Sequence, residues 1–151
     1  MYLVQGSRSL RHEEWLDLPR DEMMTLWYRD CYASTTYAGV AGWAQRLAHE
    51  SLERGYSHRS YFETVLEVGG NRGEHLAFVK HSFAEYLLTD VAKPSLDENA
   101  AFTGNRGQVR CLQADVQKLP FPSMSIDRVI VTCVLHHVSD PELALDEIRR
   151  V

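Results

Sequence analysis

Three acidic residues, Glu67, Asp90 and Asp115, each stand at the end of a short apolar run in this 151-residue chain. The first is followed by a polar turn with glycines at positions 69, 70 and 73. Glycine has no Cβ, so the backbone of such a turn can take positive φ angles and a ligand can approach it closely. A phosphate cradle needs bare backbone N–H groups without a nearby anion. The carboxylate of Glu67 therefore predicts a ligand that carries a positive charge.

Asp90 follows Glu67 by 23 residues. In nucleotide-binding α/β folds, an acid about 20 residues after the glycine turn accepts hydrogen bonds from the hydroxyls of a ribose. The spacing therefore favours a ligand that contains a ribose. An Asp that only begins the turn into Lys93 and Pro94 is the alternative interpretation.

A pair of histidines, His136 and His137, follows the longest apolar run of the chain. An imidazole titrates near neutral pH, so either side chain could remove a proton from an oxygen or nitrogen nucleophile. The plainer interpretation is that one histidine packs at the start of a helix while the other is exposed. The sequence does not choose between the two residues or between the two roles.

Alternating apolar runs and helical segments must position these side chains. The runs predict four buried parallel strands, at 65–68, 86–91, 109–114 and 129–135. Periodic apolar residues with their stop signals predict helices over 42–54, 74–81 and 142–151. Open α/β sheets bind ligands outside the carboxyl ends of their strands, so the three acids are expected to share a cleft there.

The same periodicity predicts which faces of the later helices are buried. The middle helix would cover the sheet with its apolar residues Leu76, Val79 and Phe83. The last helix would do so with Leu143, Leu145 and Ile148. Before it, Asp140 is expected as the N-cap and Pro141 at the first helical position.

Residues 1–58 are expected to form a helical extension ahead of the sheet. On its helix over 42–54, Arg46 and His49 lie three apart on one face, which is expected to be solvated. An aromatic and hydroxyl-rich stretch precedes this helix. Tyr28 and Tyr37 are either contacts of a lid over a bound ligand or parts of an aromatic loop that packs over the core.

The turn resembles the first motif of class I S-adenosylmethionine-dependent methyltransferases, acid-x-Gly-x-Gly-x-Gly. Glu67, Gly69 and Gly73 match it, and Asn71 stands at the middle glycine. Asn tolerates left-handed backbone conformations better than most residues, so it suits that position. The run from 115 to 151, with its paired histidines, resembles the methyltransferase type 11 pattern. The resemblance covers residues 60–151.

This resemblance implies a Rossmann-like doubly wound parallel sheet at 59–151, S-adenosylmethionine as the cofactor, and a small-molecule methyl acceptor. In the family, an acid and the apolar residue after it bind adenine, and here these are Asp115 and Val116. The implied cofactor-binding residues are Glu67, Gly69, Gly70, Gly73, Asp90, Val91, Asp115, Val116 and Cys133, the last through a carbonyl. His136 and His137 fall where the family builds its substrate side.

Bulk composition is that of a soluble globular domain, with 44% hydrophobic and 25% charged residues. The net charge of −5 disfavours nucleic acid as a partner. Cys31, Cys111 and Cys133 lack the spacing of a disulfide framework or a metal site, so reduced thiols in the cytoplasm are expected. The longest apolar run is too short to insert into a membrane.

The printed sequence stops where the family continues into further strands of its usual seven-stranded sheet. The fourth strand would then be a sheet edge, which favours pairing with another chain, including a second copy. Three interpretations stay open. The chain is a fragment of a methyltransferase, a subunit completed by a partner or homo-oligomer, or a non-catalytic domain that binds S-adenosylmethionine or only protein. A nicotinamide dehydrogenase would need GxGxxG, and a P-loop would need a Gly-Lys-Ser/Thr ending.

Overall fold

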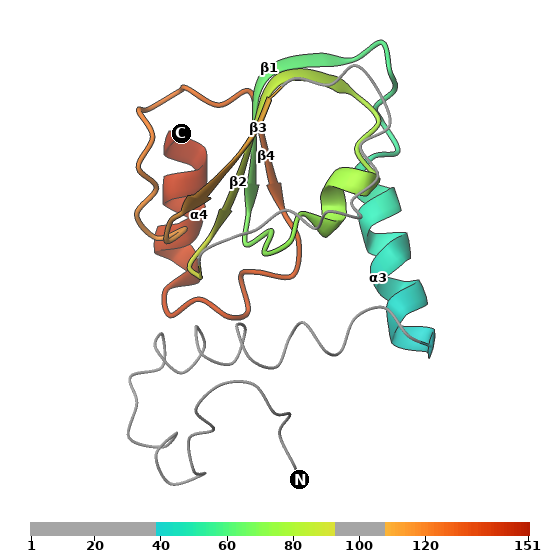
Figure 1. Ribbon diagram of the computed structural model, residues 1–151. Coiled ribbons are helices and arrows are strands. Elements are labelled where there is room, and N and C mark those ends of the chain that lie inside the picture. Colours follow the sequence, from blue (N-terminus) through green and yellow to red (C-terminus); the bar gives the residue numbers. More distant parts are fainter. Residues whose placement is uncertain (1–38, 93–107) are drawn as a thin grey trace, which may run out of the picture.

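The computed structural model describes residues 39–92 and 108–151 (Figure 1). In chain order the elements are α3 (Gly39–Leu52), β1 (Tyr61–Val68), the 3₁₀ helix η2 (Glu74–Ala77), β2 (Ser82–Asp90), β3 (Gln108–Gln113), β4 (Arg128–Val131) and α4 (Pro141–Arg150). Tyr28 and Tyr37, the two candidate lid residues, lie outside the described residues. Within the two described ranges, no helix combines the length and apolarity needed to cross a membrane.

The four strands form one parallel sheet in the order β3-β2-β1-β4. The chain builds outward from β1 to β3 and then crosses back, so that β4 pairs with the other side of β1 over Val65↔Arg128 to Val68↔Val131. This reversal makes the sheet doubly wound, as predicted. Among the described residues it also places β4 at an edge of the sheet, as expected.

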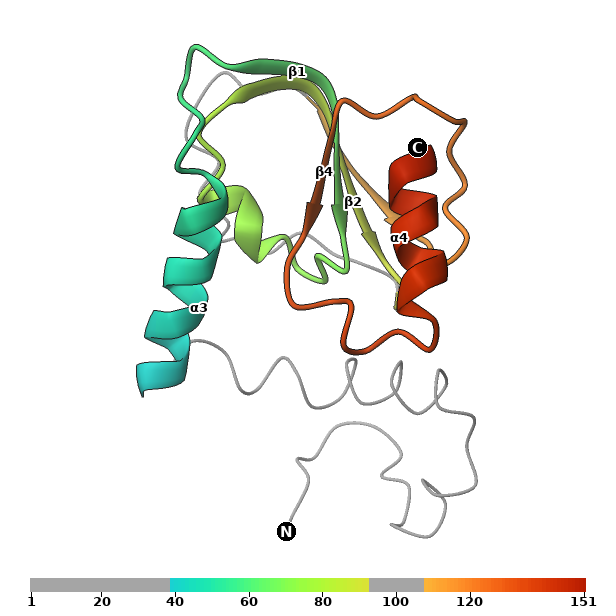
Figure 2. The same ribbon diagram turned by 180° about the vertical axis from the view of Figure 1, so that it is seen from behind.

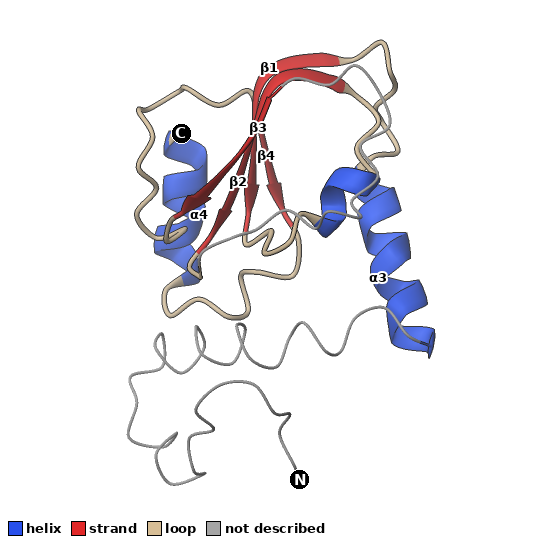
Figure 3. Ribbon diagram, viewed as in Figure 1, coloured by secondary structure: helices blue, strands red, loops and turns tan. Residues whose placement is uncertain are grey.

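Helices lie on both sides of the sheet, with α4 on one side and α3 and η2 on the other (Figures 2 and 3). Successive side chains of β1 point to opposite faces of the sheet, so this strand contributes residues to the hydrophobic core on each face. The core under α4 consists of Leu66, Val68, Leu87, Val116, Leu119, Ala144 and Val151. The opposite core consists of Val65, Leu76, Val79, Phe83, Tyr86 and Ile130.

The crossover from β1 to β2 differs from the prediction. A helix was expected over 74–81, but only the short η2 forms, and Phe83 lies on β2 rather than on a helix. The register explains this: β2 pairs with β1 from Tyr61↔Ser82 onward, which leaves only residues 69–81 for the whole connection. Leu76 and Val79 are nevertheless buried.

The strand predicted over 129–135 is also wrong in its length and burial. β4 ends at Val131, and Cys133 has a positive φ of 56° that is incompatible with a strand. Of the four β4 residues only Ile130 is buried, because β4 has a strand neighbour on one side only among the described residues.

The inner face of α4 is the predicted one at Ile148 but not at the two leucines. Leu143 and Leu145 are 46% and 37% exposed, whereas Ala144 is fully buried and Ile148 packs against the core. Ala144 and Ile148 are four residues apart and share one helix face, which the two leucines flank. The predicted cap is confirmed: Asp140 Oδ1 accepts a hydrogen bond of 3.0 Å from the backbone N–H of Leu143.

Helix α3 is turned differently from the prediction. His49 was expected on a solvated face but is buried, at 7% exposed, while Trp43 is 63% exposed. Arg46 is exposed and pairs with Glu50 at 3.6 Å. The buried His49 contacts the rest of the domain at His75 and Phe78.

Candidate functional site

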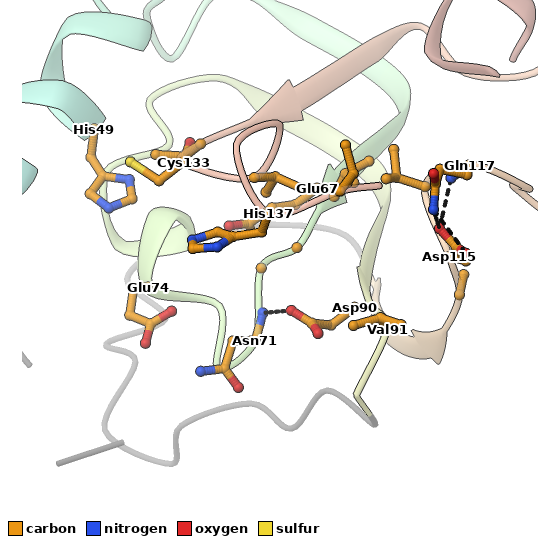
Figure 4. A pocket seen from close by; sticks show the side chains of 18 of the residues that line it. His49, Glu67, Asn71, Glu74, Asp90, Val91, Asp115, Gln117, Cys133 and His137 are labelled. Atoms are coloured by element: carbon orange, nitrogen blue, oxygen red, sulfur yellow. Dashed lines mark hydrogen bonds between the residues drawn. The ribbon is translucent and has the colours of Figure 1, made fainter. Parts of the chain in front are cut away.

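A cleft opens at the carboxyl ends of the strands, next to the point where the order reverses between β1 and β4 (Figure 4). Its free volume, including the part open to solvent, is about 1070 Å³. The cleft brings together these predicted residues: Glu67, Gly69, Gly70, Asp90, Val91, Asp115, Val116, Cys133 and His137. Gly73 and His136 do not line it.

The glycine turn after β1 is built on alternating left-handed residues, Gly69 (φ 66°), Asn71 (φ 43°) and Gly73 (φ 75°). Asn71 thus adopts the backbone conformation that explains why Asn is tolerated there. At Gly70 a Cβ would lie 2.2 Å from Leu88 Cδ1 and 2.7 Å from Glu67 Cδ, so this position has no room for a side chain.

Glu67 points from β1 into this turn and is 3% exposed. The hydroxyl of Tyr86 donates a hydrogen bond of 2.7 Å to Glu67 Oε2. Burial raises the pKa of Glu67 to about 8, and the hydrogen bond from Tyr86 only partly opposes it. Glu74 and Asp90 raise the pKa of Glu67 further. A cationic group in the cleft would favour the ionised carboxylate.

Asp90 ends β2 and is 7% exposed. It accepts backbone hydrogen bonds from Asn71 N–H (3.1 Å) and Ala92 N–H (3.0 Å), one on each oxygen. Burial raises the pKa of Asp90, and these N–H donors oppose that effect. The two hydrogen bonds fix the carboxylate beside the glycine turn, so its position depends on backbone rather than on flexible side chains.

Asp115 follows β3 at the opposite end of the cleft from His49 and Cys133 (Figure 4). Its Oδ1 accepts a hydrogen bond of 2.8 Å from the backbone N–H of Gln117. Val116 is buried in the α4-side core. The backbone N–H of Ala114 donates to the carbonyl of Asp90 at 2.9 Å, which ties the ends of β2 and β3 together.

The two histidines after β4 occupy different places. His137 lines the cleft, while His136 is exposed, with its ring centroid 3.7 Å from that of His137. The backbone N–H of His137 donates to the carbonyl of Val134 at 2.8 Å, which closes the turn that presents it. Of these two histidines, His137 is therefore the one placed to contact a molecule in the cleft.

Thr132 and His49 line the cleft although the sequence analysis did not select them. The Oγ1 atom of Thr132 is buried and has no hydrogen-bond partner among the described residues. A buried unsatisfied hydroxyl costs about 1–3 kcal/mol, so a ligand that pairs with it gains that contact. A lone Thr directly after a strand gives no sequence signal. His49 gave no such signal either, because its burial beside His75 depends on how α3 packs.

Comparisons with known proteins agree with this geometry. The methyltransferase domain family matches residues 66–151. The chain is similar to the uncharacterized methyltransferase YcgJ of Bacillus subtilis, with 32% identity over 91 residues that cover 58% of this chain and 35% of YcgJ. The crystal structure of YcgJ superposes with a TM-score of 0.54 at 27% identity and covers 70% of this chain and 46% of YcgJ.

Two further relatives differ in how much they share with the chain. Demethylmenaquinone methyltransferase of Clavibacter sepedonicus is 28% identical over 89 residues, which cover 59% of this chain and 36% of that enzyme. A hybrid PKS-NRPS synthetase, poxE, of Penicillium oxalicum is 28% identical over 144 residues, 89% of this chain and 3% of the synthetase. The chain spans little more than a third of YcgJ and of the demethylmenaquinone enzyme.

Proposed function

This chain belongs to the methyltransferase domain family, and on that premise we propose that it binds S-adenosylmethionine in the strand-end cleft and transfers its methyl group to a small-molecule acceptor. S-adenosylmethionine supplies an already activated methyl group, so the protein mainly has to orient the reactants and exclude water.

The observation that carries the proposal is that three acids from three strand ends line one cleft. Glu67 is buried and has no cationic partner among the described residues, so its carboxylate suits the positively charged end of the cofactor. Asp90, fixed beside the glycine turn, suits the ribose hydroxyls. Asp115 lies at the end of the cleft away from Cys133, and we assign it and Val116, which also lines the cleft, to the adenine. The unsatisfied Thr132 hydroxyl, on a residue that also lines the cleft, offers one more polar contact.

The acceptor class is inferred from position and similarity. Demethylmenaquinone methyltransferase, which shares 28% identity over 89 residues, is named for a quinone-type small molecule. In this chain His137 lines the end of the cleft away from Asp115, so we assign it to the acceptor side. His136, which is exposed, is not assigned a role in the reaction.

A non-catalytic domain is the second candidate, because β4 leaves one edge of the sheet without a strand neighbour among the described residues. Such a domain would bind S-adenosylmethionine without transferring its methyl group, or it would only bind a protein through that edge.

Calorimetry with S-adenosylhomocysteine, the demethylated product, tests the proposed pocket on the chain as it stands. We expect Asp90→Ala to weaken binding at least tenfold and His137→Ala to leave it within a factor of about two. The reason is that Asp90 would contact the cofactor directly, whereas His137 would face the acceptor.

The reverse order of effects would overturn the pocket assignment. No binding at millimolar ligand would favour a domain that interacts only with protein. Binding without methyl transfer to a broad acceptor panel would favour the non-catalytic candidate over the enzyme.

A further inference from the structure

Tyr86 is a core residue that reaches the cleft through its contact with Glu67. It belongs to β2, is 0% exposed, and packs in the core on the η2 side of the sheet, with its ring centroid 5.2 Å from that of Phe83. Its hydroxyl donates the hydrogen bond of 2.7 Å that Glu67 Oε2 accepts. Because the ring is held by close packing, the hydroxyl has little freedom to move. Tyr86 therefore fixes one oxygen of Glu67 from inside the core.

The second oxygen of Glu67 is available to the cleft. Glu67 lines the cleft, and its Oε1 accepts no hydrogen bond from a described residue. Oε1 is also not among the fully buried atoms that lack a partner, so it reaches the open space. Gly70 keeps this space clear, because a Cβ there would lie 2.7 Å from Glu67 Cδ. One carboxyl group thus has one oxygen held by the core and one oxygen open to a ligand.

The cleft around Glu67 is rich in acidic groups. Among the described residues that line it, four are carboxylic acids and none is lysine or arginine. The titratable groups that share the cleft with Glu67 are Glu74, Asp90, Asp115, His49, Cys133 and His137 (Figure 4). Behind Tyr86, Glu53 and Arg128 pair with each other and act on the pKa of Tyr86 in opposite directions. A cationic group of a ligand would therefore be stabilised beside Glu67.

We propose that Tyr86 is a positioning residue that holds the Glu67 carboxylate so that Oε1 accepts a hydrogen bond from the ammonium group of the cofactor, and that this contact selects adenosine derivatives that bear an ammonium. This inference rests on the proposed function. In the acid form of Glu67, the hydrogen bond from Tyr86 to Oε2 leaves the proton on Oε1. An ammonium group cannot share Oε1 with that proton, so binding sends one proton from Glu67 to the buffer. Tyr86 assists this loss, because its hydrogen bond favours the carboxylate.

A purely structural contact between the two strands would not need a carboxyl group at position 67. Burial raises the pKa of Glu67 to about 8, which shows that the buried carboxylate is disfavoured. A glutamine could accept the same hydrogen bond from Tyr86 without any charge. The hydroxyl of Thr89 already donates to the backbone carbonyl of Glu67 at 2.9 Å and joins β1 to β2 there. A ligand that needs a carboxylate therefore explains the pair better than strand pairing does.

Calorimetry with two adenosine compounds tests the selection. S-adenosylhomocysteine bears an ammonium group, whereas 5′-methylthioadenosine lacks the whole amino-acid part. Titrations in buffers of different ionisation enthalpy measure the protons released on binding. At pH 7 we expect S-adenosylhomocysteine to release about one proton and 5′-methylthioadenosine to release none. Between pH 6 and pH 7.5 the affinity for S-adenosylhomocysteine should rise, because less work is then needed to ionise Glu67, and the affinity for 5′-methylthioadenosine should stay constant.

Tyr86→Phe removes the hydroxyl and keeps the ring in the core. At pH 7 it should weaken binding of S-adenosylhomocysteine at least about tenfold and leave binding of 5′-methylthioadenosine within a factor of about two. Tyr61→Phe is the matched control, because the Tyr61 hydroxyl donates a similar hydrogen bond of 2.6 Å to Glu63 but Tyr61 is 59% exposed. It should change neither affinity by more than about twofold. Glu67→Gln should abolish the proton release, which identifies Glu67 as its source.

The outcomes separate this inference from the proposed function. Equal losses for both compounds in Tyr86→Phe would show that Tyr86 only supports the fold, and would overturn the inference. Binding of S-adenosylhomocysteine without proton release would overturn it as well, although the pocket of the proposed function would stand. If neither compound binds the unmodified chain, the proposed function fails and this inference fails with it.

Discussion

The carboxyl group of Glu67 is buried, and among the described residues no cationic side chain pairs with it. It is 3% exposed, and the hydrogen bond it accepts from Tyr86 comes from an uncharged donor. Burial raises its pKa to about 8, so the ligand-free folded state holds a proton that the unfolded chain has lost. Between about pH 4.5, where an ordinary glutamate side chain titrates, and about pH 8, the folded state therefore binds more protons than the unfolded chain.

The sign of the pH dependence follows from this difference. The free energy of unfolding should fall as the pH rises from about 4.5 to about 8 and then level off. Glu67→Gln should remove this slope and raise the stability of the ligand-free chain at pH 9 by about 1–3 kcal/mol, while it weakens binding of S-adenosylmethionine. Urea unfolding at pH 5, 7 and 9, with calorimetry of the cofactor, measures both effects.

Glu63→Gln is the matched control, because Glu63 accepts a similar hydrogen bond of 2.6 Å from Tyr61 but is exposed. It should change stability by less than about 0.5 kcal/mol at any of the three pH values. A Glu67→Gln variant that loses stability at pH 9 would contradict the buried, proton-holding state of Glu67.

Residue types at strand ends were predictable because each depends on local sequence. Glu67, Asp90 and Asp115 follow apolar runs, and parallel strands bring their carboxyl ends together. His49 was not predictable in the same way. Its burial depends on His75, a partner 26 residues away along the chain, and the two meet only because of the way α3 docks.

At the scale of elements, α3 is anchored by a buried ion pair. Arg128 of β4 donates to Glu53 Oε1 at 2.6 Å and to the carbonyl of Leu52 at 3.3 Å, and its guanidinium lies 4.0 Å from the ring centroid of Tyr56. These contacts join the end of α3 to the start of β4, two segments far apart in the sequence.

Glu53→Gln should therefore cost about 3–5 kcal/mol, because it leaves the buried guanidinium without its counter-ion. The pKa of Glu53 is lowered to about 2, so its contribution is fully present above about 4.5 and is lost as the pH falls toward 2. The variant should accordingly show a flatter acid-unfolding profile. Urea unfolding at pH 7, 4 and 2.5 measures this.

Glu85→Gln is the control for that prediction. Glu85 accepts from Arg110 at 2.9 Å, but the Arg110 side chain is 63% exposed. Loss of this surface pair should cost less than about 1 kcal/mol. Equal losses for the two variants would show that the Glu53 pair does not anchor α3.

Elements were predictable where a strong local signal met no tertiary conflict. The cap at Asp140 and the existence and order of the four strands are examples, since side-chain chemistry and apolar runs specify them directly; the length of β4 is not. The region over 74–81 was misassigned because its apolar spacing suits a helix, yet pairing of β2 with β1 from Ser82 onward takes up the chain that a helix would need. The register in which β2 pairs with β1 cannot be predicted from the spacing of apolar residues within one segment.

At the scale of the whole molecule, the sheet order decides where the cleft lies. The chain reverses direction across the sheet between β1 and β4, and the glycine turn, Asp90 and the residues after β4 meet beside that point. The same reversal leaves β3 and β4 as the two edges of the described sheet. These edges differ in composition: β3 has three polar or charged residues, Gln108, Arg110 and Gln113, among its six, whereas β4 has only Arg128 beside three apolar residues, Val129 to Val131.

An apolar edge strand invites pairing with another chain, whereas charged and polar side chains protect an edge. We therefore expect the 151-residue chain to self-associate through β4 at high micromolar concentration. Sedimentation velocity should show a concentration-dependent increase in mass. Hydrogen exchange should show added protection of the amides at 128–131, with those of 108–113 as the internal control. A monomer at all concentrations, with unchanged exchange in β4, would show that the unpaired edge alone does not drive association.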